Sequence, residues 1–246
     1  MSGSTAKIAL ITGANKGIGL ETARQLGQLG ITVLLGARDP AKGEEAAAKL
    51  RGAGIEARAV RLDVTDEADR ASAARLIEQD YGRLDILVSN AAILRDARTG
   101  NQTSTTSSEI LRDTFETNFF STVALTQTLL PLLRKSEAAR VVNLSSILAS
   151  LTLHATKGSP TYNAKTFAYD ASKAAVNLFT IHLGHELRHT KIKVNAADPG
   201  WVKTEMGGEG ATMEVSEGAK TSVWLATLPE DGPTGGYFHL GTQQPW

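Results

Sequence analysis

The sequence predicts an α/β fold in which a doubly wound parallel sheet of about seven strands is covered by helices on both faces. Short apolar runs alternate with longer segments of helical period along the 246 residues, which is the pattern of successive strand–helix–strand units. A turn with three glycines joins the first apolar run to the first helical segment. With 41% apolar residues, the chain can bury one large core, so we expect a single domain over residues 1–246.

Seven apolar runs are the strand candidates. They cover residues 7–12, 32–36, 56–62, 84–89, 140–146, 193–198 and 235–240. Between them, Asp39 followed by Pro40 predicts a helix start, and Thr106 with Glu109 has the spacing of a capping box. Two long polar loops, at residues 91–105 and 150–168, interrupt the alternation, and long loops in a compact domain are often functional.

The composition argues against nucleic acid, membranes and metals as partners. There are 26 basic and 26 acidic residues and the formal net charge is zero, so no broad field attracts anionic polymers or surfaces. The absence of cysteine excludes disulfides and thiolate ligands, and the histidines lack the spacing of a metal site. No apolar run reaches the roughly 20 residues that cross a bilayer, and the first residues lack a signal-like apolar core. We therefore expect a cytoplasmic protein.

The stretch TGANKGIG, residues 12–19, has the features of an anion-binding turn. In a parallel α/β sheet, the first turn opens a helix whose free N–H groups and dipole attract phosphate. Gly13 would permit a sharp exit from the strand, Gly17 close approach of the backbone to phosphate, and Gly19 tight helix packing. A Rossmann-like fold that binds a pyrophosphate is one interpretation, and a plain strand-to-helix turn is the other.

Tyr169 is the only tyrosine with a lysine, Lys173, four residues later. The pair opens a predicted helix downstream of the strand that ends in NLSS. Residues four apart share one helix face, so the ammonium group can lie near the phenol. An ordinary tyrosine has a pKa of about 10, and a nearby cation lowers it. The pair therefore predicts a tyrosine that exchanges a proton with a substrate, although such a pair also arises by chance.

These motifs follow one another in an order that resembles the short-chain dehydrogenase/reductase family, in particular its carbonyl-reductase-like branch. The matching segments are TGANKGIG, LD at residues 62–63, SNAA at 89–92, Asn118, NLSS, YDASK and DPGWVKT. The resemblance implies four catalytic residues, namely Asn118, Ser146, Tyr169 and Lys173. Ser146 would hydrogen-bond to the substrate oxygen, and Asn118 would anchor a water molecule that relays protons to Lys173. Serines at strand ends and asparagines in helices also commonly serve structure alone.

The resemblance also implies a nicotinamide dinucleotide cofactor. The residues that would bind it are Gly13, Asn15, Lys16, Gly17, Ile18, Gly19, Arg38, Leu62, Asp63, Val64, Asn90, Ala91, Tyr169, Lys173, Pro199, Gly200, Val202 and Thr204. Arg38 stands where an acidic residue would bind the ribose of NAD, and Lys16 adds a second cation, a pairing that in the family favours NADPH over NADH. The alternative is that both are solvent-exposed cations, with Asp39 partly neutralising Arg38. Asp63 would either bind the adenine amino group or cap its own loop.

We therefore expect NADPH-dependent reduction of an uncharged aldehyde or ketone to an alcohol. Residues 150–168 would form a substrate-side insert and residues 201–215 a lid, with Leu94, Leu148, Leu151, Trp201 and Met206 as candidate pocket walls that are at least as typical of a core. Ser89 and Ala92 depart from the asparagine and glycine common in the family. The alternatives are a member dedicated to a steroid-like or acyl-carrier-linked ketone, and a non-catalytic NADP(H)-binding regulatory protein. The sequence leaves monomer and homo-oligomer open.

Overall fold

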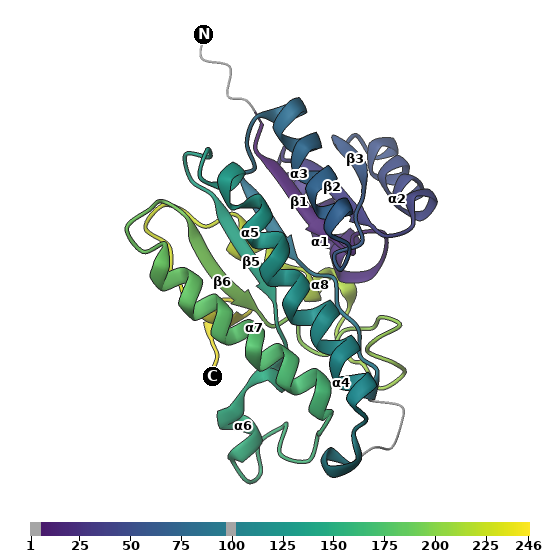
Figure 1. Ribbon diagram of the computed structural model, residues 1–246, viewed down its shortest axis with the longest axis vertical. Coiled ribbons are helices and arrows are strands. Elements are labelled where there is room, and N and C mark those ends of the chain that lie inside the picture. Colours follow the sequence, from purple (N-terminus) through teal and green to yellow (C-terminus); the bar gives the residue numbers. More distant parts are fainter. Residues whose placement is uncertain (1–5, 97–101) are drawn as a thin grey trace.

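The computed structural model describes residues 6–96 and 102–246, and its centre is one sheet of eight strands (Figure 1). The strands are β1 (Ile8–Thr12), β2 (Thr32–Ala37), β3 (Ala57–Arg61), β4 (Ile86–Ser89), β5 (Arg140–Leu144), β6 (Lys193–Ala197), β7 (Tyr237–His239) and β8 (Thr242–Gln243). Their order across the sheet is β3-β2-β1-β4-β5-β6-β7-β8, and β1 to β7 run parallel. The predicted doubly wound α/β fold is confirmed.

The eighth strand was not predicted. β8 pairs antiparallel with β7 through Phe238 with Gln243 and His239 with Thr242. Leu240 and Gly241 between them have φ angles of 45° and 80°, as a two-residue hairpin turn requires. With two exposed residues, β8 has no apolar alternation by which a strand is recognised in a sequence.

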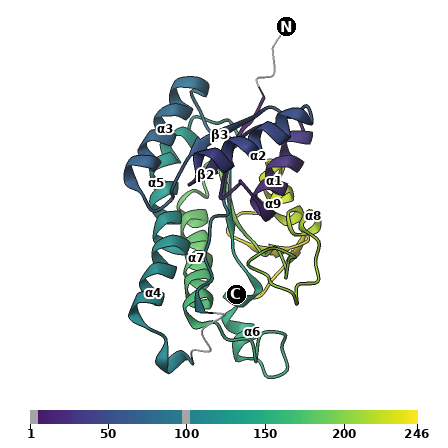
Figure 2. The same ribbon diagram turned by 90° about the vertical axis from the view of Figure 1, so that its right-hand side faces the viewer.

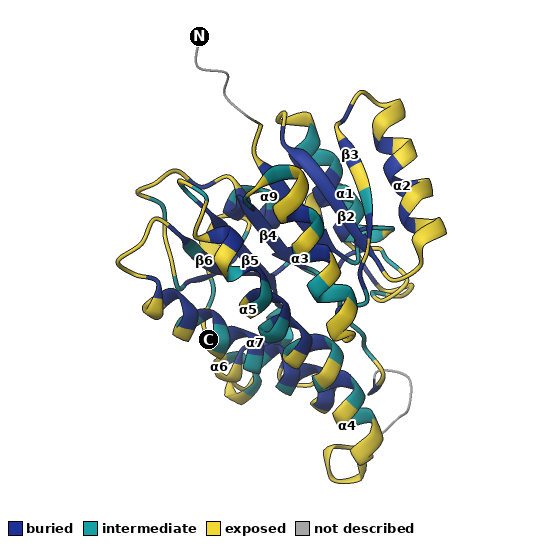
Figure 3. Cartoon of the chain, turned by 45° about the horizontal axis from the view of Figure 1, so that its top comes forward, coloured by how far each residue is buried: buried dark blue, intermediate teal, exposed yellow. Residues whose placement is uncertain are grey.

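Helices cover the two faces of the sheet in separate layers (Figure 2). One face carries α1 (Gly17–Gln28), α2 (Pro40–Gly52), α8 (Val215–Gly218) and α9 (Lys220–Ala226), and the other carries α3 (Glu67–Tyr81), α4 (Ser108–Phe115), α5 (Ser121–Leu133) and α7 (Phe167–Glu186). Alternate residues of β1 join different cores: Ile11 clusters with Leu26 of α1, and Leu10 with Leu125 of α5. The central strands and the inner helix faces are buried, whereas the outer helix faces and parts of the edge strand β3 are exposed (Figure 3). In the described ranges, no helix combines the length and apolar character that crossing a membrane requires.

One of the two predicted helix starts is confirmed and the other is wrong by one residue. Asp39 caps α2 by accepting hydrogen bonds from the N–H groups of Ala41 and Lys42, and Pro40 is the first helical residue. The cap of α4 is Ser107, which accepts from the Ile110 N–H at 3.2 Å. The Thr106 hydroxyl instead donates to the Gln102 carbonyl at 3.3 Å. Because Thr106 and Ser107 are both hydroxyl residues and either can cap a helix, the sequence did not show which of them caps α4.

The two predicted long loops are partly helical. Residues 150–168 contain α6 (Leu151–Ala155) and the start of α7 at Phe167. Residues 91–105 include a short 3₁₀ turn, η2 (Thr103–Thr105), and their part at 97–101 lies outside the described residues. A π-helical turn, η3 (Glu116–Phe120), joins α4 to α5, and a second 3₁₀ turn, η4 (Ile147–Ala149), follows β5. These short elements border the site described below.

Arg140, the first residue of β5, ties the sheet to the segment that leads into β7. Its guanidinium group is 3% exposed and donates to the carbonyl oxygens of Leu228, Pro229, Ala138, Ala139 and Lys191. Burial lowers its pKa below the ordinary value, opposed by the charge of Glu230. The cation is satisfied by backbone oxygens, so its removal would leave several carbonyl groups without donors.

We expect Arg140→Met to lower the free energy of unfolding by about 3 kcal/mol or more, because buried acceptors lose their partners. The matched control is Arg58→Met, which removes a half-exposed ion pair between Arg58 and Asp80 in β3 and α3. The control should cost less than about 1 kcal/mol. Urea unfolding of the wild type and both variants checks this, and equal losses in the two variants would contradict it.

Candidate active site

The sequence-predicted site residues gather at the carboxyl ends of β1, β4, β5 and β6. β1 lies between β2 and β4, and the chain leaves β1 and β4 toward opposite sides of the sheet, which opens a crevice at this edge. The glycine turn follows β1, Asn90 follows β4, Ser146 follows β5, and Pro199 follows β6. Segments that are far apart in the sequence therefore meet at one edge.

The glycine turn has the backbone that the sequence predicts for close contact with an anion. Gly13 and Gly17 have φ angles of 62° and 57°, which side chains rarely adopt. A Cβ atom on Gly19 would lie 2.6 Å from the Asn90 amide nitrogen and 2.7 Å from the Gly13 oxygen, so Gly19 is needed for close packing. Lys16 precedes the first turn of α1 without a side-chain cap, and the helix N–H groups there are available to a ligand.

Thr12, which the sequence analysis missed, fastens the glycine turn to the turn after β4. Its hydroxyl oxygen accepts hydrogen bonds from the N–H groups of Asn90 and Ala91, both at 2.9 Å. The Asn90 side chain donates in return to the Thr12 carbonyl at 2.7 Å. Asn90 thus has a structural role at the edge where we predicted it would bind cofactor.

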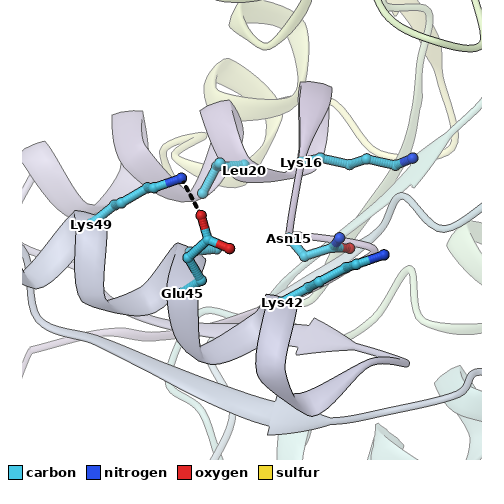
Figure 4. A pocket seen from close by; sticks show the side chains of 7 residues that line it. Asn15, Lys16, Leu20, Lys42, Glu45 and Lys49 are labelled. Carbon is cyan, nitrogen blue, oxygen red and sulfur yellow. Dashed lines mark hydrogen bonds and ion pairs between the residues drawn. The ribbon is translucent and has the colours of Figure 1, made fainter.

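A pocket of about 280 Å³ lies between the glycine turn and α2 (Figure 4). It is lined by Asn15, Lys16, Leu20, Lys42, Glu45, Ala46 and Lys49. Lys16 and Lys42 extend in the same direction on either side of Asn15 (Figure 4). Lys42 is a further cation that the sequence analysis did not single out, since only the first turn of α2 brings it beside the glycine turn.

The two cations predicted to bind a 2′-phosphate are both exposed. Lys16 forms an ion pair with Glu205, from the segment after β6. The Arg38 side chain makes no hydrogen bond or ion pair with the described part of the chain. Asp39 pairs with Lys42 at 3.8 Å rather than with Arg38, so Arg38 keeps its full charge toward solvent or a ligand.

The segment after β3 is built around buried apolar residues. Leu62 and Val64 are buried, while the Asp63 carboxylate accepts from the Thr65 N–H at 3.0 Å and the Thr65 hydroxyl at 2.7 Å. The predicted loop-capping role of Asp63 is therefore seen in the structure. Its contact with an adenine ring stays a prediction.

Asn118 occupies the π-helical turn η3, and its side chain holds the segment after β4. Its carbonyl oxygen accepts from the Ile93 N–H at 2.8 Å, and its amide nitrogen donates to the Ile93 carbonyl at 2.9 Å. The amide nitrogen also donates to the Ser172 hydroxyl of α7 at 3.0 Å. π turns in α-helices are frequent at functional sites, and this one orients Asn118 toward the helix that carries Tyr169 and Lys173.

Ser145 and Ser146 have different roles. The Ser145 hydroxyl is buried and donates to Asn177 at 2.6 Å, so it holds β5 against α7. The Ser146 hydroxyl accepts from the Leu148 N–H at 3.2 Å and is a hydrogen-bond partner of the Tyr169 hydroxyl. Of the two serines, Ser146 is the one that acts on the pKa of Tyr169, and Ser145 is structural.

The surroundings of Tyr169 favour its protonated phenol form. Burial raises its pKa above the ordinary value, the Ser146 hydrogen bond lowers it, and the charges of Asp198 and Asp170 raise it further. That Lys173 lowers this pKa stays a prediction. The Lys173 ammonium group donates to the Leu144 carbonyl at 2.7 Å and lies 5.8 Å from the Tyr169 ring centre. Burial lowers the pKa of Lys173 itself to about 8, so its positive charge is weakened.

The segment predicted as a lid, residues 201–215, is held together by contacts between its own residues. Val202 forms a β-bridge with Met213, and the Trp201 indole donates to the Gly207 carbonyl at 2.9 Å. Gly200 has a φ angle of 79°, and the methyl group of Thr204 lies 3.5 Å from where a Gly17 Cβ would be. The chain thus leads from β6 back to the glycine turn through Pro199, Gly200, Val202 and Thr204. Movement of the segment stays a prediction.

The five candidate wall residues are not part of the buried core. Leu151 and Trp201 are 70% and 59% exposed, Met206 is also exposed, and Leu94 and Leu148 are partly exposed. Large apolar side chains that remain accessible near a site are typical of ligand-binding surfaces. In the part of the chain that the structure describes, no three acidic, histidine or cysteine side chains are grouped to hold a metal ion.

We expect the buried Lys173 to make stability depend on pH. Between about pH 8 and pH 10 the unfolded chain keeps a lysine proton that the folded chain has released, so the free energy of unfolding rises with pH. Lys173→Met should abolish this rise, which is on the order of 2 kcal/mol. Urea unfolding at several pH values measures it. Lys135→Met, at an exposed lysine paired with Glu78, should keep the rise, and a rise retained in Lys173→Met would disprove the assignment.

Comparison with known proteins identifies the family. Residues 7–214 match the family model for short chain dehydrogenase. Carbonyl reductase [NADPH] 1 of Mus musculus is 32% identical over 287 residues, with 99% of each chain covered. The NADPH-bound carbonyl reductase from chicken fatty liver superposes with a TM-score of 0.85 at 28% identity, covering 98% of this chain and 99% of that one. Salutaridine reductase from Papaver somniferum gives 0.81 at 29% identity, covering 95% and 99%. The chain therefore belongs to the short-chain dehydrogenase/reductase family, in its carbonyl-reductase-like branch, and is an oxidoreductase.

Proposed function

We propose that this protein reduces an uncharged aldehyde or ketone to an alcohol, with Tyr169 as the acid that protonates the carbonyl oxygen. The observation that carries the proposal is that the Lys173 ammonium group lies 5.8 Å from the Tyr169 ring centre on one face of α7, while hydrogen bonding with Ser146, after β5, lowers the pKa of Tyr169. Two adjacent hydroxyl donors can hold one carbonyl oxygen and stabilise the charge that develops on it.

The oxidoreductase uses NADP(H), as its relatives among the NADPH-dependent carbonyl reductases do. The residues present fit that group. The left-handed Gly13 and Gly17 open a turn at the uncapped start of α1, where a pyrophosphate is favoured. Arg38, Lys16 and Lys42 are the cations available for a 2′-phosphate. When bound, NADPH supplies the hydride that the carbonyl carbon receives.

The proton is supplied by the protein. Burial keeps Tyr169 protonated, so its hydroxyl can give a proton to the carbonyl oxygen as that oxygen gains charge. Ser146 holds the same oxygen and the tyrosine. Carbon gains one hydride and oxygen one proton, which balances the conversion of carbonyl to alcohol. The reverse reaction requires Tyr169 to accept the proton again.

The Asn118 amide and the Lys173 ammonium group hold the segments around this acid. Asn118 hydrogen-bonds to the Ile93 backbone and to the Ser172 hydroxyl. Lys173 donates to the carbonyl oxygen of Leu144, the last residue of β5. Lys173 also lies within reach of a cation–π contact with the Tyr169 ring. We assign both residues to the catalytic set with Ser146 and Tyr169.

The exposed apolar side chains suit a substrate without charge. Leu151 and Trp201 come from the insert and from the segment after β6, and both are exposed. Apolar surface contributes binding free energy in proportion to the area it buries, so a bulky carbonyl compound would gain more than a small one. A panel of small aldehydes, aryl ketones, diketones and cyclic ketones ranks the substrates by loss of NADPH absorbance.

We expect Tyr169→Phe to reduce kcat by a factor of about 100 or more, because the proton donor is lost, while the affinity for NADPH changes little. Lys173→Ala should lower both turnover and NADPH affinity. Steady-state kinetics and NADPH titration of the purified variants measure the two effects.

The control for the tyrosine variant is Tyr81→Phe, at the end of α3 and away from the site. It should have the kinetics of the wild type. Turnover retained in Tyr169→Phe would refute the assignment of the acid, whereas NADPH binding without turnover of any panel member by the wild type would favour a regulatory protein.

We expect Arg38→Asp to change cofactor preference from NADPH toward NADH by a factor of about ten or more, because a carboxylate repels a 2′-phosphate and can bind a ribose hydroxyl. The ratio of kcat/KM for the two cofactors is the readout. Arg75→Asp, an exposed arginine of α3 that contacts Ser72, should leave the ratio unchanged. An unchanged ratio in Arg38→Asp would place the phosphate contact elsewhere.

A further inference from the structure

His154, in the substrate-side insert, is a partly buried histidine that the proposed reaction does not use. It lies in α6, at the end of the molecule where α7 begins (Figure 1), and its side chain is 16% exposed. The ring contacts three separate segments, namely the turn η4 after β5, the far end of the insert and the first turn of α7. Two of these segments adjoin Ser146 and Tyr169.

The contact with Lys165 indicates which ring nitrogen of His154 carries the hydrogen. The Lys165 ammonium group lies 2.8 Å from Nδ1, and it also donates to the carbonyl oxygens of His154 and Thr161 at 3.3 and 3.2 Å. An ammonium group has donors only, so Nδ1 must accept and the hydrogen is on Nε2. Nε2 lies 2.9 Å from the Leu148 carbonyl oxygen, which can only accept. Both contacts thus assign the same tautomer.

The Nε2–H group holds the turn that borders the Ser146 hydroxyl. Leu148, in η4, is bound at both of its backbone groups. Its carbonyl accepts from His154 at 2.9 Å, and its N–H donates to the Ser146 hydroxyl oxygen at 3.2 Å. Because the hydroxyl accepts this bond, its own hydrogen stays available to donate to another oxygen. His154 therefore acts on the direction of the Ser146 hydroxyl through one intervening residue.

The same ring is bound to the helix turn that carries Tyr169. Asp170, the next residue of α7, has a carboxylate oxygen 3.4 Å from Nε2 of His154. The Asp170 carboxylate also accepts from the N–H and the hydroxyl of Thr166, at 3.0 and 2.6 Å, so its position is fixed at the start of α7. The His154 ring therefore links η4, which follows Ser146, to the helix that carries the proposed acid.

α6 has attachments that do not involve the His154 ring. The Thr152 N–H donates to the Trp246 carbonyl at 2.9 Å, and the Ser150 hydroxyl accepts from the Leu153 N–H at 3.1 Å. These contacts should keep α6 in place when the ring is replaced. A variant at position 154 therefore tests the hydrogen bonds of the ring rather than the folding of the insert.

We propose that His154 is a positioning residue: with its tautomer set by Lys165, it links the Leu148 turn to α7 and directs the Ser146 hydroxyl toward the carbonyl oxygen of the substrate. The inference rests on the function proposed above, in which Ser146 and Tyr169 bind that oxygen. It adds that the insert contributes to kcat as well as to substrate affinity, because a displaced hydroxyl stabilises the developing charge less well.

His154→Leu and His154→Gln separate the hydrogen bond from the volume of the side chain. The glutamine amide can donate to the Leu148 carbonyl as Nε2 does, whereas leucine has no donor. We expect His154→Leu to lower kcat by about tenfold and His154→Gln to restore it to within about threefold of the wild type. The Kd for NADPH should be unchanged in both variants. His154→Met is the second apolar variant if His154→Leu does not fold.

His182→Leu is the matched control, at an exposed histidine of α7, and it should have the kinetics of the wild type. Equal kcat values in the apolar and glutamine variants of His154 would overturn the proposal. So would a change confined to KM for the carbonyl compound, since His154 would then only support the apolar wall.

Nitrogen NMR of the histidine rings measures the tautomer without turnover. The signals that disappear in His154→Gln identify His154, and we expect its proton on Nε2 in the wild type. Lys165→Met should allow both tautomers, whereas Lys157→Met, at an exposed lysine of the same insert, should keep the wild-type signals. A proton on Nδ1 in the wild type would contradict the assignment.

The two proposals fail in different ways. If Tyr169→Phe keeps its turnover, the proposed function fails. If Tyr169→Phe is inactive and His154→Leu has the same kcat as His154→Gln, only the role of His154 fails.

Discussion

The site depends on the parallel pairing of β1, β4, β5 and β6, which brings four carboxyl strand ends to one edge of the sheet. At that edge the ladder stops, and the backbone groups of the following turns need other partners. Short polar side chains provide them: Thr12 binds the turn after β4, Asn118 binds Ile93, and Asp198 binds the turn after β6. The turn after β5 is held in the same way, since the Tyr237 hydroxyl donates to the Ser146 carbonyl at 2.6 Å.

Desolvation governs the chemistry of the Tyr169–Lys173 helix. Both side chains are buried, and burial moves each toward its neutral form, which raises the pKa of Tyr169 and lowers the pKa of Lys173 to about 8. The geometry expected from the helix period is present, since the Lys173 ammonium group lies 5.8 Å from the Tyr169 ring centre while it donates to the Leu144 carbonyl. A neutral phenol is the form needed to protonate a carbonyl oxygen, and the interior of the fold is sufficient to maintain it.

Local patterns in the sequence were enough to predict β1 to β7, the glycine turn after β1 and the Tyr169–Lys173 helix, because each depends on residues that are close in the chain. Features set by distant contacts could not be predicted. The hydrogen bonds of Asn118 depend on a π-helical turn that has no clear signature in the sequence, and the two-residue β8 carries too few residues to show a period. The cap at Ser107 was missed because its neighbour is also a hydroxyl residue, and only three-dimensional packing distinguishes the two.

The substrate-side insert is attached to the same helix turn that carries Tyr169. Asp170 accepts from the N–H and hydroxyl of Thr166, at 3.0 and 2.6 Å, and lies 3.4 Å from the His154 ring at the end of α6. Lys165 joins this cluster by donating to the His154 ring at 2.8 Å. These contacts fix the two ends of the insert against α7, while the Leu151 side chain remains exposed. Loops anchored on a rigid scaffold can vary without moving the scaffold, so the apolar wall can change with the substrate while Tyr169 stays in register with Ser146. Under the proposed function, the separation between a fixed acid and a variable wall would let one catalytic geometry serve different carbonyl compounds.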